Sequence, residues 1–145
     1  QDGAWNDTEP DADKFTSTVA WLGAGDDAIA YCWTAIPGYS AFGSFEGNNN
    51  ADGPFIYTGF RVRYLLLKDI DATKAWAIKD TARDSTNANN SWLEANSNGA
   101  EQSTGDIDFL SNGFKIRTTV SDANAADTFV YCAFAEHPFK TARAR

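Results

Sequence analysis

The sequence predicts an all-β fold, an antiparallel β-sandwich of the jelly-roll or lectin-like type with roughly eight or nine strands and a half-repeat at its N-terminus. Three observations support this prediction. Short runs rich in Val, Ile, Thr and aromatic residues recur roughly every 8 to 15 residues, between clusters of Gly, Asn, Asp and Pro. No long run has helical periodicity, and one strand-like segment occurs twice. The 145 residues suffice for one domain with a sizeable core.

The repeated segment is 27–36, DAIAYCWTAI, which is similar to 128–136, TFVYCAFAE. Tyr31-Cys32 in the first copy matches Tyr131-Cys132 in the second, and a proline follows each copy. A Phe-led segment and a polar loop precede both. We therefore expect 1–38 to be the second half of a preceding repeat, and 39–145 to be a complete repeat that ends at the natural C-terminus.

Strands are expected, in order, at 15–22, 27–36, 39–47, 61–70, 74–79, 91–97, 107–110, 114–119 and 128–136, and 55–57 leads into the strand at 61–70. The segment 61–70 is apolar on both faces past Arg63, which indicates a central strand. The segment 74–79 is ambiguous, because Ala and Lys favour a helix while Trp76 and Ile78 alternate as in a strand. We favour a strand, since a short element between strands pairs easily. Loops are expected at 48–54, 82–90, 98–106 and 121–127, and Asn112-Gly113 suits a tight turn.

The net charge of −8, carried mostly by Asp, disfavours nucleic acid as a partner. No apolar run approaches the length of a membrane span, so no membrane partner is expected. Cys32 and Cys132 occupy equivalent places in the two copies, and we expect each to be a small buried apolar side chain in its own strand. Their redox state stays open.

Several phrases of the sequence resemble a known family. They are 42–61 (FGSFEGNNNADGPFIYTGFR), 65–68 (LLLK), 75–84 (AWAIKDTARD), 107–118 (IDFLSNGFKIRT) and 131–145 (YCAFAEHPFKTARAR). In these phrases the chain resembles a repeated domain of unknown function at the C-terminal ends of tail and tail-fibre proteins of bacteriophages, many of them marine. The resemblance implies a virion protein on a lectin-like sandwich, located on the outer surface of the particle. It supplies no catalytic or ligand residues.

The residues offer little for catalysis. His137 is the only histidine, and its place between Glu136 and Pro138 at a strand end predicts a plain surface position. No His/Cys cluster suits zinc, and Asp is so abundant that any carboxylate pair is uninformative. We expect no enzyme and no cofactor.

Calcium is the one metal considered. Asp69 with Asp71, and Asp106 with Asp108, could supply oxygen ligands, but Asp also occurs in turns because it bonds its own backbone. The chain has no twelve-residue calcium loop, so the turn interpretation is favoured.

A glycan on the host surface is a candidate ligand. Tyr57 and Trp92 are aromatic residues close to Asn-rich loops, and Asn87 and Asn89 lie beside Trp92 in the sequence. Packing in the core is the commoner fate of a strand Trp or Tyr.

The half-repeat at the N-terminus suggests assembly. Its strands would leave edges and apolar faces to be covered, and a neighbouring subunit could cover them by strand addition. Trp5, Phe15, Trp21 and Trp33 would then be buried against another chain. In the alternative, the two halves fold on each other within one chain.

The leading hypothesis is a non-enzymatic phage structural protein of the tail or fibre type. It assembles with copies of itself or with other virion proteins and contributes to attachment to the host surface. The alternatives are a carbohydrate-binding module, or a capsid-decorating or filament-forming subunit linked by strand addition. A hydrolase is a weaker third hypothesis.

Overall fold

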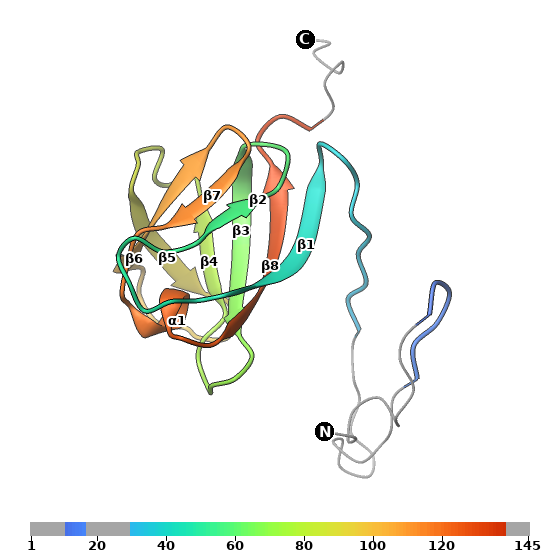
Figure 1. Cartoon of the computed structure of the whole chain (residues 1–145), viewed down its shortest axis with the longest axis horizontal. Helices are drawn as coiled ribbons and strands as arrows, with labels where there is room; N and C mark the ends of the chain where they lie inside the picture. The colour runs from blue at the N-terminus through green and yellow to red at the C-terminus, as the bar shows by residue number, and fades with distance from the viewer. Residues whose placement is uncertain (1–10, 17–29, 139–145) are drawn as a thin grey trace. The chain divides into compact units, whose positions relative to one another are not determined.

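The computed structural model describes residues 11–16 and 30–138, and the chain divides into two compact units, Gln1–Trp33 and Thr34–Arg145. The strands of the described residues lie in the second unit (Figure 1). They are β1 (Ser40–Glu46), β2 (Phe55–Tyr57), β3 (Val62–Asp69), β4 (Ala77–Asp80), β5 (Asn89–Glu94), β6 (Gln102–Leu110), β7 (Gly113–Ile116) and β8 (Thr128–Ala135), with a short helix, α1 (Ser121–Asn124), before β8. The predicted all-β class is confirmed.

Over the described residues, the eight strands form one antiparallel sheet in the order β1-β8-β3-β4-β5-β6-β7-β2. The sheet curls so that β7 and β2 cross in front of β3 and β8 (Figure 1). Aromatic rings from the two layers meet between them, since the ring centroid of Phe114 lies 5.6 Å from that of Tyr131 and 6.2 Å from that of Phe45. The architecture is therefore an antiparallel sandwich that is nearly closed into a barrel.

The core lies inside this curl. Strand β3 supplies Val62, Leu65 and Leu67, which are at most 1% exposed. Around them pack buried apolar residues from the other strands and their flanks, namely Ile56, Phe60, Ala77, Trp92, Ile107, Phe109, Phe114, Ile116, Ala133 and Ala135. Each large apolar side chain contributes roughly 1.5–3 kcal/mol on burial, so this cluster is the main source of stability.

Two strand predictions depended on pattern alone, and both are confirmed. Strand β3 lies between β8 and β4, as its apolar residues on both faces indicate. The ambiguous segment 74–79 contributes strand β4, in which Ile78 pairs with Leu66 on one side and Leu93 on the other. Position between two strands thus outweighs the helix propensity of Ala and Lys.

Three predicted loops contain regular structure, and one of them, 82–90, includes Asn89 and Asn90 of strand β5. Strand β6 begins at Gln102, inside the expected loop 98–106, because Gln102 and Ser103 pair with Trp92 and Ser91 of β5 through the main chain. The expected loop 121–127 contains α1. Neither the polar start of β6 nor α1 has an apolar pattern from which it could be predicted.

The first copy of the repeated segment does not form the strand predicted at 27–36. Residues 30–36 have no strand, and Ile36 makes a single isolated bridge to Ser40. Residues 27–29 lie outside the described residues, as do 17–22 of the strand predicted at 15–22, whose described residues Phe15 and Thr16 are not in a strand.

The two cysteines differ in environment. Both are free thiols; Cys132 is half-buried in β8, where burial raises its pKa, whereas Cys32 is exposed. The prediction of a buried Cys32 is therefore wrong. In the described part of the chain, the segment of Cys32 has no strand neighbour, while Cys132 is paired between Phe42 and Leu66.

Candidate assembly surface

The sheet has two ends, β1 and β2. Counted over the described residues, neither strand has a strand partner on its outer side. Strand β1 is the longer edge, with seven residues against three in β2. A free edge offers main-chain donors and acceptors to an added strand, so β1 is the better site for strand addition.

A tight turn leads into β1. The N–H of Ile36 donates to the carbonyl oxygen of Ser40 at 3.2 Å, and the N–H of Ser40 donates to that of Ile36 at 3.0 Å. Gly38, with a φ of 76°, supplies the left-handed residue between them. The Ser40 hydroxyl also donates to the carbonyl oxygen of Thr34 at 3.1 Å. These bonds form the first rung of an antiparallel ladder, and within residues 30–36 no second rung follows.

The segment before this turn exposes large apolar side chains. Tyr31 is 72% exposed, Trp33 58% and Ile36 39%. The rings of Tyr31 and Trp33 stack with centroids 5.9 Å apart and an interplanar angle of 16°. We call residues 30–36 the aromatic segment. Large exposed apolar side chains gathered in so short a stretch are typical of an interaction surface.

Four residues were predicted to be covered by a second chain. Two of them, Phe15 and Trp33, are exposed in the chain by itself, at 44% and 58%. The other two, Trp5 and Trp21, lie outside the described residues. Sequence reasoning missed Tyr31 and Ile36, although the alternation of Tyr31 with Trp33 in an extended segment was a usable signal for Tyr31.

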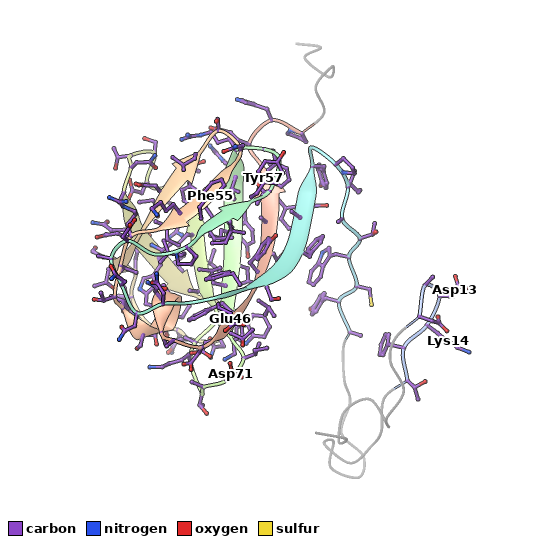
Figure 2. All side chains as sticks on the ribbon, viewed as in Figure 1. Asp13, Lys14, Glu46, Phe55, Tyr57 and Asp71 are labelled. Atoms are coloured by element: carbon purple, nitrogen blue, oxygen red, sulfur yellow. The ribbon has the colours of Figure 1, made fainter. Side chains whose placement is uncertain are left out.

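The predicted glycan-binding residues do not form one site. Tyr57 is 67% exposed and lies beside Phe55 on β2 (Figure 2). The Trp92 side chain is only 1% exposed, so the prediction that it stacks on a sugar is wrong. Asn89 is fully buried, and Asn87 exchanges hydrogen bonds with the main chain of Phe109, at 3.1 and 3.0 Å. The amide of Asn87 is thus occupied by the fold, and burial keeps Asn89 from contact with a sugar.

The calcium candidates Asp69 and Asp71 accept hydrogen bonds from main-chain N–H groups. Asp69 is fully buried and accepts hydrogen bonds from the N–H groups of Asp71 and Ala72, at 2.9 and 3.0 Å. Asp71 in turn accepts from the N–H of Thr128 at 2.8 Å, which lowers its pKa. These contacts fit the turn interpretation.

Asp106 and Asp108 lie on β6, where Asp108 pairs with Arg117 at 3.4 Å. No group of three or more His, Cys, Asp or Glu residues with metal-binding geometry occurs in the described part of the chain.

His137 is exposed directly after β8, in the surface position predicted for it. Within residues 11–16 and 30–138, no helix has the length and apolar character needed to cross a bilayer.

Residues 1–138 match the model of a family described as a domain of unknown function, DUF7483. No curated protein and no solved structure matches the chain.

Proposed function

Because the chain belongs to this domain family of unknown function, we propose its role from its surfaces: a non-enzymatic structural domain that assembles with copies of itself through the aromatic segment and the outer edge of β1. The observation that carries the proposal is the combination of a strand-like sequence at 30–36, which forms no strand with the described residues, with a seven-residue edge strand that begins after the turn at 37–39.

The aromatic segment is similar in sequence to a strand of this sheet. It corresponds to β8, with Tyr31-Cys32 in the place of Tyr131-Cys132. Strand β8 pairs with β1 on one side and with β3 on the other. A segment with the same pattern therefore suits an antiparallel position next to a β1-type strand. Since β8 occupies the inner side of β1, the outer edge of β1 in a second copy is the place that remains.

We further propose that the domain belongs to an external virion structure of the tail or fibre type, with attachment to the host surface as its task. The resemblance of 42–61 and 131–145 to phage tail domains supports this location. A capsid-decorating or filament-forming subunit would use the same contact. Labelling native particles of the encoding phage with an antibody against this domain, and imaging them, tests the location. Label confined to the particle interior would contradict it.

The assembly contact has a direct test. The Tyr31→Asp variant places a charge in the aromatic segment, and Tyr57→Asp is the matched control because the two side chains are 72% and 67% exposed. We expect sedimentation equilibrium to show self-association of the natural chain and at least about tenfold weaker association of Tyr31→Asp, equivalent to about 1.4 kcal/mol. Tyr57→Asp should associate like the natural chain. A chain that stays monomeric, or equal effects of both variants, would overturn the proposal.

A second candidate function is glycan binding at β2. Phe55 and Tyr57 project from the same side of this strand and are 45% and 67% exposed (Figure 2). Aromatic side chains of this kind bind the apolar faces of sugars. A glycan array probed with the natural chain and with Tyr57→Ala tests this candidate: binding that Tyr57→Ala abolishes supports it, and an array without signal rejects it.

A further inference from the structure

Two polar residues are fully buried next to each other on the neighbouring strands β4 and β5. Lys79 and Asn89 are both 0% exposed. The Nζ of Lys79 donates to the main-chain oxygen of Asn89 at 3.3 Å and to that of Thr104 on β6 at 3.4 Å. Among the described residues, no carboxylate lies close enough to form an ion pair with this amine. The lysine is thus held by two weak hydrogen bonds to carbonyl groups.

Burial without an ion pair shifts the protonation equilibrium of this amine toward the neutral form. Removal from water lowers the pKa of Lys79 to about 8, against the opposing attraction of Asp106 and, second to it, Asp84. The neutral form has the free electron pair that a nucleophile needs. Sufficient neutral amine is therefore present at physiological pH for a slow reaction with a nearby electrophile.

Asn89, whose main-chain oxygen accepts from this amine, has a side-chain amide that is itself held in place. Its Nδ2 donates to the main-chain oxygens of Asp80 at 3.0 Å and Asp84 at 2.7 Å. Its Oδ1 is buried and has no hydrogen-bond partner. Such an unsatisfied buried oxygen is costly and calls for an explanation. A register shift between Asn89 and Ser91 marks the same point of β5.

We propose that Lys79 and Asn89 join to form an intramolecular isopeptide bond that ties β4 to β5. The electron pair of Nζ attacks Cγ of Asn89, the bond between Cγ and Nδ2 breaks, and Nδ2 leaves as ammonia. The proton lost by Nζ is the proton that Nδ2 gains, so the step balances within the pair. The reaction needs no oxidant and no cofactor, because one amide replaces another. Burial excludes water and holds the reacting groups on adjacent strands.

Peptide mapping of the natural chain tests the bond. Trypsin should fail to cut after Lys79, and mass spectrometry should find one branched peptide in which 75–83 is joined to 84–115, lighter than the sum of the two by one ammonia. The map is needed because a change in total mass does not identify the residues that have lost ammonia. Release of linear peptides 75–79 and 84–115 would overturn the proposal.

Two substitutions sharpen the test. Asn89→Asp should give the same branched product with loss of water in place of ammonia, so its final mass equals that of the natural crosslinked chain. Lys79→Arg keeps the buried positive charge but removes the nucleophilic amine, and its peptides should be linear. Lys74→Arg, a lysine variant outside the pair, should remain crosslinked. A branched peptide in Lys79→Arg would overturn the assignment, and the map of the natural chain decides even if a variant fails to fold.

Discussion

Single buried polar residues, more than pairs of surface charges, hold the irregular parts of this fold in place. Asn124 of α1 is the main case, since it is fully buried and uses its whole side chain. Its Oδ1 accepts from the N–H of Asn48 at 2.9 Å, and its Nδ2 donates to the main-chain oxygens of Asn50 and Thr118, at 2.7 Å each. One amide therefore ties the loop after β1 to the helix before β8.

The Asn124→Ala variant should lose about 2–4 kcal/mol of unfolding free energy, because it leaves several buried donors and acceptors without partners. Urea denaturation measures the loss. Asn98→Ala is the matched control, since Asn98 is exposed in the loop before β6. Equal stability of the two variants would contradict the role assigned to Asn124.

Asp84 gives a prediction about pH. It accepts hydrogen bonds from the hydroxyl of Thr86 at 2.7 Å and from the N–H of Asn90 at 3.0 Å, and these bonds lower its pKa below the usual value of 3.8. A carboxylate with a lowered pKa stabilises the fold above its unfolded pKa, and this contribution disappears as the pH falls through the folded pKa. Asp84→Asn cannot titrate. Between pH 5 and the acid range below about 3.8 it should therefore lose less stability than the natural chain, as urea titrations at both pH values would show. Parallel losses would argue against this account.

At the scale of elements, periodicity predicted the strands that have neighbours within the chain. The alternation in 61–70 located the central strand β3, and Asn112-Gly113 marked the turn between β6 and β7. The polar start of β6 was not predictable, because main-chain pairing with β5 alone makes it a strand. Residues 30–36 show the reverse case, in which a strand-like pattern finds no second rung among the described residues. A strand-like sequence pattern shows that a segment is able to pair as a strand. Whether the strand forms depends on a neighbouring strand that pairs with it.

The same limit applies to the candidate sites. Aromatic residues could be listed from the sequence, but their burial could not be predicted, because Trp92 and Tyr57 each have one polar and one apolar neighbour. The structure places one in the core and the other on an edge. The close approach of Lys79 to Asn89 depends on the pairing of β4 with β5 and on the register shift in β5, neither of which has a sequence signal.

The edge strand β2 depends on a glycine in β7. A Cβ built on Gly113 would lie 2.1 Å from the main-chain oxygen of Ile56, which is the central residue of β2. Gly113→Ala should therefore separate β2 from β7 at a cost of about 1–3 kcal/mol. Faster hydrogen exchange of Ile56 and Tyr57 would report the separation. Gly99→Ala, in an exposed loop, should leave this exchange unchanged, and the prediction is wrong if both variants exchange alike.

At the scale of the whole molecule, the chain combines a well-packed, nearly closed sheet with a strand-like segment that the described fold does not use. The long apolar strands lie in the middle of the sheet, and β1 and β2 form its ends. A second copy would supply the outer neighbour of β1 and cover the aromatic segment in one step. Under the proposal, assembly supplies the strand neighbours that the described part of a single chain lacks.

Hydrogen exchange measured over a range of protein concentrations tests this claim most directly. Amides become protected when they enter a ladder, and protection that depends on concentration identifies a contact between copies. We expect the amides of residues 30–36 and of β1 to become more protected as the concentration rises, while those of β3 stay equally protected throughout. Exchange in residues 30–36 and β1 that is the same at every concentration would contradict assembly through this edge.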